Sequence, residues 1–274
     1  MEVRDLSFTP VANSNPEYLT ADQIDFYNTN GYIRPLNVFD DLEATVQQTY
    51  FNWQLARVLA ARDGRDPYSI NGFHTRWQGL YDICTHPMLL NYVQDIIGPD
   101  IICWGSHFFC KLPQDPKMVP WHQDASYWPL NPARTVTVWL AIDDADEENA
   151  AMEFIPGTHT KGHLRWRQAK GEVVLGQEIE GIENLGSPVY DELKAGQISL
   201  HADMLAHGSK ANTSLRRRCG LTIRYCLPNV NTGDSGWNHN SILARGVDPT
   251  GHWANNPRPL GEDITATIFA SQAG

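Results

Sequence analysis

The sequence predicts a mainly β protein, a cupin-like jelly roll (double-stranded β-helix) with helices packed at its N-terminal side. Up to about residue 99 the apolar residues recur at helical spacing. After Asp100, short β-branched and aromatic runs alternate with Pro, Gly, Asn and Asp clusters, as in sandwiches and barrels. A chain of 274 residues suits one large domain. We expect a single domain over 1–274, with a helical layer at about 1–99, a jelly-roll core at about 100–230 and a loop-rich segment at about 231–274.

Helices are expected in three places before residue 100. Thr20 is a suitable N-cap for a helix from about Ala21 to Asn28, which Gly31 would close. A second helix is expected from Asp41 to about Ala61, where apolar residues follow helical spacing: Leu42, Val46, Tyr50, Trp53, Leu55 and Leu59. A third covers His86 to Ile97 and stops at Gly98-Pro99. The expected strands are 101–110, 135–142, 151–155, 172–174, 197–201 and 219–227.

Composition limits the classes of partner. The formal net charge of −11 and the pI of about 5.3 disfavour nucleic acid and anionic membranes. No stretch approaches the roughly 18 apolar residues of a membrane span, and the first residues lack a signal-peptide pattern. The cysteines are scattered without zinc spacing, which predicts buried free thiols and a reducing, cytoplasmic location: Cys84, Cys103, Cys110, Cys219 and Cys226. We expect a small-molecule partner, while the oligomeric state is open.

The run around His122-Gln-Asp124 carries the strongest chemical signal. Residues i and i+2 of a strand point to one face, so His122 and Asp124 can hold one metal while Gln123 points away. His207 adds a second imidazole, and Arg218 follows it with a guanidinium fork for a carboxylate. Two imidazoles and one carboxylate are the ligands of a non-haem Fe(II) site with open positions. A 2-oxoacid can fill two of these positions and O2 the third.

An isolated His-x-Asp triplet is weak evidence, and the chain contains a second one at His201-Ala-Asp203. Such a pair is most often a hydrogen-bonded surface pair. Because it stands just before His207, we expect His201 and Asp203 to shape or orient the site, with His201 as a ligand the less favoured alternative.

Several motifs in order resemble the phytanoyl-CoA dioxygenase family of Fe(II)/2-oxoglutarate oxygenases, which includes ectoine hydroxylase. The resemblance covers nearly the whole chain. It rests on Leu19–Tyr32 with its Asn-Gly-Tyr turn, on Trp121–Asp124, on Ile155–His159, and on a distal motif of His207-Gly-Ser209, Asn212, Ser214 and Arg218.

The resemblance implies roles for individual residues. His122, Asp124 and His207 match the iron ligands, and Arg218 matches the arginine that pairs with the far carboxylate of 2-oxoglutarate. Ser209 matches a polar contact to the cosubstrate, and Trp128, which matches an aromatic close to the site, is grouped with Arg218 and Ser209 as a cosubstrate-binding residue. Alternation places Arg216 on the face of Arg218, so Arg216 is an alternative partner for 2-oxoglutarate; a one-residue slip in the matching would give the role to Arg217.

The resemblance also implies the class of reaction. Related halogenases have Ala or Gly where this chain has Asp124, so hydroxylation of an unactivated C–H bond is favoured, with release of succinate and CO2. Desaturation, epimerisation and cyclisation stay open. A small polar metabolite is the preferred substrate, with acyl-CoA, aminoalkylphosphonates and natural-product scaffolds as alternatives. A non-catalytic cupin-like binding protein and a zinc hydrolase are the alternatives outside this class.

Two loop regions are candidates for substrate recognition. The segment 158–170 carries Lys161, Arg165, Arg167 and Lys170, either as a solvated hairpin or as a basic lid over an anionic substrate. Tyr127, Trp128 and Trp237 could enclose a quaternary ammonium group through cation–π contacts, or could simply fill the core.

Overall fold

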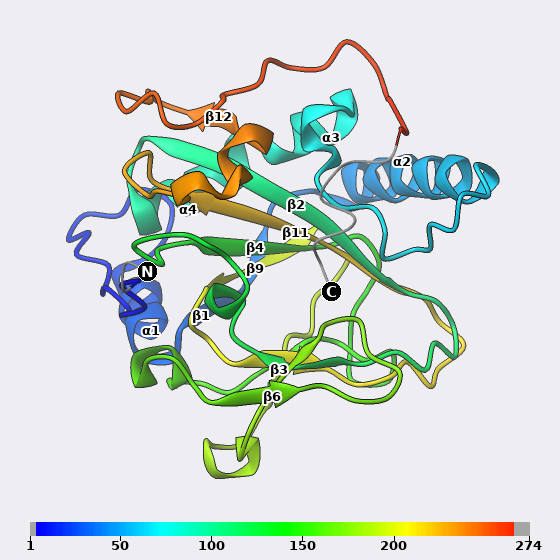
Figure 1. Ribbon diagram of the computed structural model, residues 1–274, viewed down its shortest axis with the longest axis horizontal. Helices are drawn as coiled ribbons and strands as arrows, with labels where there is room; N and C mark the ends of the chain where they lie inside the picture. Colours follow the sequence, from blue (N-terminus) through cyan, green and yellow to red (C-terminus); the bar gives the residue numbers. More distant parts are fainter. Residues whose placement is uncertain (1–3, 266–274) are drawn as a thin grey trace.

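A computed structural model describes residues 4–265 and contains two main antiparallel sheets (Figure 1). The larger sheet has six strands in the order β1-β9-β4-β11-β2-β12. Their bounds are β1 Tyr32–Asn37, β9 Gln197–Ala202, β4 Val136–Ala141, β11 Arg218–Cys226, β2 Ile101–Lys111 and β12 Ile242–Arg245.

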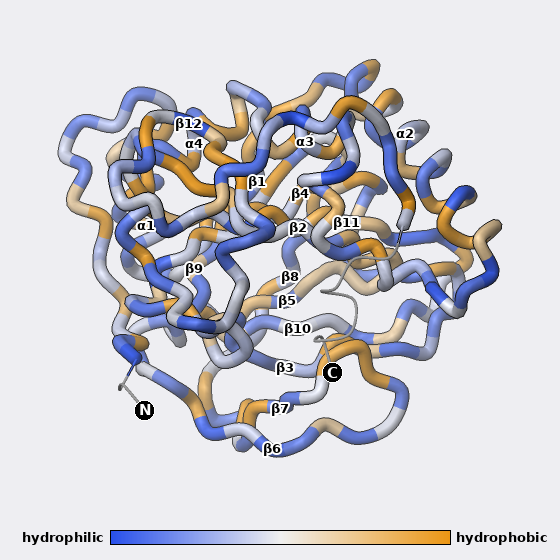
Figure 2. Tube along the Cα trace, turned by 45° about the horizontal axis from the view of Figure 1, so that its top comes forward, coloured by the Kyte–Doolittle hydropathy of each residue, from blue (hydrophilic) through white to orange (hydrophobic). Residues whose placement is uncertain are grey.

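The smaller sheet has four strands in the order β3-β10-β5-β8, namely Val119–His122, His207–Ser209, Glu153–Phe154 and Val189–Tyr190. A ribbon of β6 (Trp166–Gln168) and β7 (Gln177–Ile179) lies beyond it (Figure 2). The mainly β architecture expected from the sequence is therefore confirmed, and its strands pair antiparallel in each sheet.

The expected helices are present. Helix α1 spans Ala21–Asn30, and the Thr20 side chain and Gln23 form a capping box at its start. Gly31 ends this helix in the left-handed conformation that glycine adopts without strain. Helix α4 spans Pro87–Ile97. A further helix, α3 (Gln78–Cys84), was not expected from the sequence.

Helix α2 spans Asp41–Ala60, as expected, but its buried face differs from the one that the apolar spacing indicated. Leu42, Val46, Trp53 and Leu59 are exposed. Phe51, Leu55 and Val58 are buried instead, together with Ala44 and Gln54. The helix therefore packs through a narrow stripe. Its buried face was predicted wrongly because apolar residues also occur on its exposed side.

Alternation along the larger sheet separates the core from the site. On β11, Cys219, Leu221, Ile223 and Tyr225 pack in the main core with residues of α2, α3 and α4. The intervening residues Arg218, Thr222 and Arg224 line a cavity on the opposite face. The helices thus cover one face of this sheet and leave the other for chemistry (Figure 1).

Both edges of the larger sheet come from outside the expected core range of 100–230. Strand β1 pairs with β9 and strand β12 pairs with β2, so the predicted helical layer and loop-rich segment each contribute a strand. Pro35 obscured β1, because proline removes a ladder donor and is confined to positions such as an edge strand.

The expected strand at 172–174 is wrong. Val173 forms only an isolated bridge with Met118, because this short run is bounded by Gly171 and Gly176. Among residues 4–265, none of the helices has the length and apolar character that a membrane crossing requires.

Candidate metal centre

His122, Asp124 and His207 converge at one end of the smaller sheet. His122 ends β3, His207 begins β10, and the two residues lie directly opposite each other in the antiparallel pair. Asp124 begins the short 3-10 helix η2 (Asp124–Ser126). One possible ligand atom from each of the three lies within 4.8 Å of the others. The Nε2 atoms of His122 and His207 are 3.6 and 4.0 Å from Oδ1 of Asp124.

Backbone carbonyls set the orientation of both imidazoles. Nδ1 of His122 lies 2.8 Å from the Pro120 carbonyl oxygen, and Nδ1 of His207 lies 3.0 Å from the Leu205 carbonyl oxygen. A carbonyl only accepts, so each Nδ1 carries the proton and each Nε2 keeps its lone pair. Burial also lowers the pKa of His207 well below its ordinary value, which keeps that ring neutral. Both rings are therefore prepared as metal ligands.

Asp124 is held as an anion in a buried position. Burial alone would raise its pKa, but the neighbouring imidazoles of His122 and His201 and the charge of Arg224 bring the pKa well below the ordinary value. Thr137 on β4 donates a hydrogen bond of 3.2 Å to Oδ2. The donor set of two neutral imidazoles and one carboxylate fits a divalent iron ion.

The second His-x-Asp pair lies beside the centre. Nε2 of His201 is 3.7 Å from Oδ2 of Asp124, and the ring centroids of His201 and His207 are 4.8 Å apart. Asp203 accepts a hydrogen bond from the Thr135 backbone, and its own carbonyl accepts one from the Ala125 N–H beside Asp124. The pair therefore borders Asp124 and fixes the turn that carries it.

Gln123 points away from the three converging side chains. Its amide donates to the carbonyls of Gly162 and Met204, and its Oε1 accepts from the Leu164 N–H. This arrangement follows from strand alternation and ties the loop after β3 to the segments on its other side.

A smaller cavity of about 400 Å³ of space, part of it open to solvent, adjoins the centre and contains Arg218 and Ser209. Nε and Nη2 of Arg218 donate to the Ala150 carbonyl at 3.0 and 2.8 Å, and the guanidinium lies 5.6 Å from the centroid of the Trp139 ring. Nη1 of Arg218 makes no hydrogen bond to any residue in 4–265, and the buried Oγ of Ser209 also lacks a partner there. Two donors without acceptors in one cavity suit a carboxylate.

The neighbouring arginines are engaged elsewhere. Arg216 is partly exposed and pairs with Asp146 and Glu148 at 2.7 and 2.8 Å. Arg217 pairs with Asp143 at 2.7 Å. The alternation argument for Arg216 does not apply, because β11 begins only at Arg218. Of the three arginines, only Arg218 lines the cavity beside the centre.

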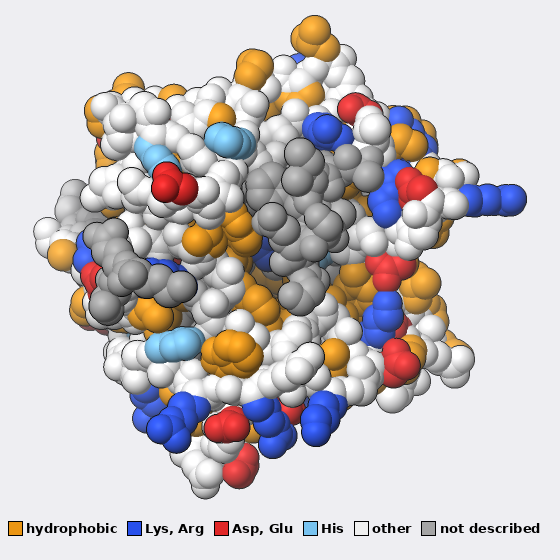
Figure 3. All heavy atoms as spheres, viewed as in Figure 1, with side chains coloured by type: hydrophobic (Ala, Val, Ile, Leu, Met, Phe, Trp, Pro, Cys, Tyr) orange, Lys and Arg blue, Asp and Glu red, His pale blue; other side chains and the backbone are white. Residues whose placement is uncertain are grey.

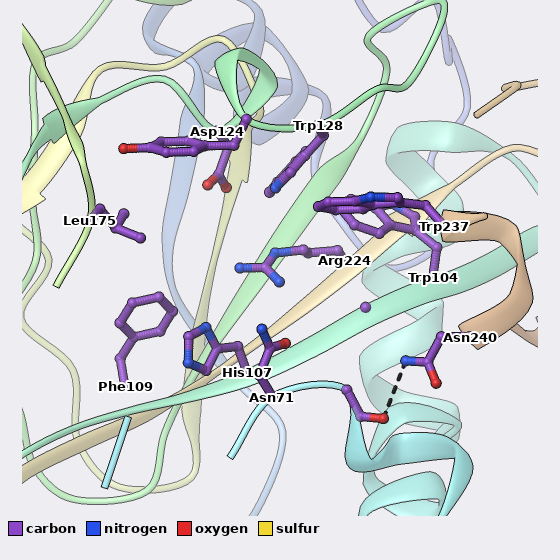
Figure 4. A pocket seen from close by; sticks show the side chains of 13 residues that line it. Asn71, Trp104, His107, Phe109, Asp124, Trp128, Leu175, Arg224, Trp237 and Asn240 are labelled. Atoms are coloured by element: carbon purple, nitrogen blue, oxygen red, sulfur yellow. Dashed lines mark hydrogen bonds between the residues drawn. The ribbon is translucent and has the colours of Figure 1, made fainter. Parts of the chain in front are cut away.

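A larger cavity of about 760 Å³, part of it open to solvent, lies on the other side of Asp124 (Figure 4). Trp128 is placed here and is not among the residues around the smaller cavity. Trp104, His107 and Trp237 also line it. Arg224 lies below Asp124 in Figure 4, and both of these residues line the smaller cavity as well. A cavity of this size and aromatic character is typical of a small-molecule site.

Arg224 is the most informative residue that sequence reasoning missed. It lies six positions after Arg218 on β11, so the alternation of a strand predicts that both side chains point to the same face. Thr222 between them also faces the cavity, and Gly220 lacks a side chain because a Cβ there would lie 2.0 Å from the Trp139 ring. The even spacing from Arg218 could have indicated Arg224 from the sequence, but Arg224 belongs to none of the motifs that identified the site.

The structure bears on both hypotheses about substrate recognition, the basic lid at 158–170 and the aromatic enclosure of an ammonium group. The basic residues of 158–170 are exposed near the β6–β7 ribbon, where Lys and Arg gather at the lower edge of Figure 3, and none of them lines either cavity. The charge near Trp128 argues against a quaternary ammonium ligand at that residue. There the guanidinium of Arg224 lies 5.1 Å from the Trp128 ring centroid and 5.8 Å from that of Trp104. An ammonium group would meet a like charge.

Residues 27–220, more than half of the chain, match the family model described as phytanoyl-CoA dioxygenase. The chain belongs to the phytanoyl-CoA dioxygenase family. The peroxisomal phytanoyl-CoA dioxygenase of Bos taurus is 28% identical over 158 residues, which are 55% of this chain and 47% of the relative. The chain thus spans about half the length of the curated relatives that it matches first.

Solved structures show the same architecture. The non-heme monooxygenase ThoJ, in its apo form, has a TM-score of 0.74 and 28% identity, covering 87% of this chain and 88% of its own. Apo EctD from S. alaskensis has a TM-score of 0.69 at 20% identity, covering 81% and 83% of the two chains. At that identity EctD shows the shared fold alone.

Proposed function

We propose that the protein is a dioxygenase dependent on Fe(II) and 2-oxoglutarate, which hydroxylates an unactivated C–H bond of a small polar metabolite and releases succinate and CO2. His122, Asp124 and His207 would hold the iron, Arg218 and Ser209 the cosubstrate, and the larger cavity the substrate. The family supports the activity, and the resemblance to ThoJ, a non-heme monooxygenase, agrees with it. We also assign the two facing sheets to a double-stranded β-helix.

One observation carries the proposal. The three converging side chains line the smaller cavity, where the donors of Arg218 and Ser209 have no acceptor in 4–265, and Asp124 also lines the larger cavity. A divalent cation and a dicarboxylate would satisfy all of these groups together. Bound iron supplies the reductive activation of O2 that is coupled to oxidative decarboxylation of 2-oxoglutarate.

The residues of the chain have separate tasks in this scheme. The carbonyls of Pro120 and Leu205 keep the Nε2 atoms of both histidines available. Ala150 and Trp139 fix the Arg218 guanidinium so that Nη1 remains for the far carboxylate of the cosubstrate. Trp128, which sequence reasoning grouped with the cosubstrate, would contact the substrate instead, because it lines the larger cavity.

The proposal is tested by an anaerobic visible spectrum of purified protein, recorded as Fe(II) and then 2-oxoglutarate are added. We expect a weak metal-to-ligand charge-transfer band that appears only with both additions. Metal analysis of the same sample shows whether Fe(II) is bound. Bound iron without a band on adding 2-oxoglutarate would overturn the proposal and favour a non-catalytic binding protein.

A further inference from the structure

Arg224 is a half-buried cation whose guanidinium has no hydrogen-bond or ion-pair partner in the described part of the chain. Burial lowers the pKa of its guanidinium, and Asp124 is the carboxylate that opposes this shift. No hydrogen bond or ion pair joins the guanidinium to any residue in 4–265, and its buried Nε has no acceptor. Buried polar groups are nearly always satisfied, so an unpaired guanidinium at a cavity wall calls for an acceptor from outside the protein.

The surroundings of Arg224 leave space for that acceptor. Figure 4 shows its guanidinium near the middle of the larger cavity, below Asp124 and above His107. Burial lowers the pKa of His107 to about 4, and its Nε2 is engaged with the Tyr68 carbonyl at 2.6 Å, so this neighbour is neutral. Trp104 and Trp128 lie against the cation. The cavity therefore contains one positive charge between apolar aromatic walls.

The charge of the loaded site also favours an anion. Among the residues around the two cavities, Asp124 is the only carboxylate, while Arg218 and Arg224 are the only lysines or arginines. The metal ion brings two positive charges, and 2-oxoglutarate brings two negative ones that the metal and Arg218 already engage. With Asp124, Arg218 and Arg224 included, the formal charge of the loaded site would be plus one. Arg224 carries the positive charge that has no counter-charge. A monoanionic substrate would neutralise it.

We propose that Arg224 anchors an oxyanionic group of the substrate, a carboxylate or a phosphonate, and that the substrate is a small organic anion whose apolar part packs on Trp104 and Trp128. This inference rests on the proposed function, whose substrate class it narrows. The guanidinium fork offers parallel donors to two oxygens, which makes Arg224 a specificity-determining residue.

The test compares three ligands that share one aromatic body: phenylacetate, benzylphosphonate and the neutral phenylacetamide. Each is titrated by calorimetry, without oxygen, into protein loaded with Fe(II) and 2-oxoglutarate. The variants are Arg224→Gln, which removes the charge, and Arg224→Lys, which keeps the charge but loses the fork. Arg245→Gln is the matched control, because Arg245 lies on β12 of the same sheet, pairs with Gln94 and lines neither cavity.

We expect wild type and Arg245→Gln to bind at least one anion in preference to the amide. Arg224→Gln should weaken anion binding roughly 10- to 100-fold, the usual loss for one charge-assisted contact. The amide should bind as before, and Arg224→Lys should fall between. Stronger binding of phenylacetate identifies a carboxylate as the natural group, and stronger binding of benzylphosphonate identifies a phosphonate. Thermal melts of all variants confirm that they are folded.

Three outcomes would overturn the inference. In the first, wild type shows no preference for either anion over the amide at millimolar concentration. In the second, Arg224→Gln binds the anions as tightly as wild type does. In the third, Arg224→Gln raises the 2-oxoglutarate concentration needed for the visible band as much as Arg218→Gln does, which would make Arg224 a cosubstrate residue. A missing band in wild type instead counts against the proposed function, because the band and the heat of anion binding are read separately.

Discussion

Arg218 and Arg224 lie on the same face of the same strand, yet their surroundings differ in one respect that decides their use. Two nitrogens of Arg218 are fixed by the Ala150 carbonyl, which leaves a single corner of the guanidinium for a ligand. Among residues 4–265, the guanidinium of Arg224 contacts the rings of Trp104 and Trp128 and forms no hydrogen bond or ion pair. The first arginine is thus prepared for one geometry, whereas the second can adapt to the position of its ligand. This difference suits an invariant cosubstrate and a variable substrate.

The strongest challenge to this comparison is removal of Asp124, the carboxylate that lines both cavities. Asp124→Ala should reduce succinate release to background, because it deletes the anionic ligand and the charge balance of the iron. Metal binding is measured in parallel. Asp25→Ala, at an exposed position on α1, is the control and should leave turnover unchanged. Turnover near the wild-type level in Asp124→Ala would refute the assignment of the metal ligands.

The next largest effect should distinguish the arginines around residue 218. Arg218→Gln should raise the 2-oxoglutarate concentration needed for the visible band roughly 10- to 100-fold, because it removes a charge-assisted pair. Arg216→Gln should leave that titration unchanged, since Arg216 binds Asp146 and Glu148 at the surface. Equal sensitivity of both variants would contradict the separate roles.

Substitutions at two glycines test the packing around the two arginines separately. A Cβ on Gly220 would lie 2.0 Å from the Trp139 ring, whereas a Cβ on Gly105 would meet Arg224 at 3.4 Å. Gly220→Ala should lower the free energy of unfolding by about 1–3 kcal/mol and weaken 2-oxoglutarate binding through Trp139. Gly105→Ala should cost well under about 1 kcal/mol and leave the contacts of Trp139 unchanged, because its Cβ would meet Arg224 instead. Urea unfolding and the band titration measure both effects, and a reversed order would contradict this model of the packing.

The smallest expected effect is a loss of stability at low pH that arises from His74, a neighbour of Asn240 in the wall of the larger cavity. Burial lowers the pKa of His74 to about 4, and this histidine contacts the Asn240 carbonyl and Ser106. The unfolded chain binds a proton there below its ordinary pKa of about 6.5, whereas the folded protein does not. This contribution to stability is therefore lost as the pH falls from 6.5 toward 4. Between pH 7.5 and 5.5 we expect a loss of about 1 kcal/mol from this group.

The contribution of His74 is measured as the difference between wild type and His74→Gln in urea unfolding at both pH values. The variant should lose less stability over this interval, since glutamine does not titrate. Identical pH dependence of the two proteins would show that His74 is not the group responsible.

The sequence predicted those parts of the molecule that follow local rules. The helix that begins after Thr20 has its capping box, and the alternation around Gln123 directs that side chain away from the metal ligands. The convergence of His122 with His207 could be expected only from the motif, because it depends on the pairing of β3 with β10. The buried face of α2 was misjudged, since the position of a helix on a sheet is decided by tertiary packing rather than by its own spacing.

Arg224 shows a different limit of sequence reasoning. An arginine within an apolar strand fits either an internal ion pair or a ligand site, and the decision depends on whether a carboxylate reaches it from another element. That information is present only when all the surrounding elements are in place. For Arg216 and Arg217 such carboxylates are present, at Asp146 and Asp143, and for Arg224 none in 4–265 forms a pair.

The edge strands of the larger sheet have a consequence for synthesis on the ribosome. Strand β1 emerges early but pairs with β9, which begins only at Gln197, and β12 closes the opposite edge from Ile242 onward. Until then Ile33 and Leu36, both buried in the finished protein, have no sheet to cover them. Contacts so distant in sequence form slowly, and nascent chains with uncovered strands depend on chaperones. His122 on β3 and His207 on β10, the two histidines proposed to hold the metal, thus come together only after most of the chain has been made.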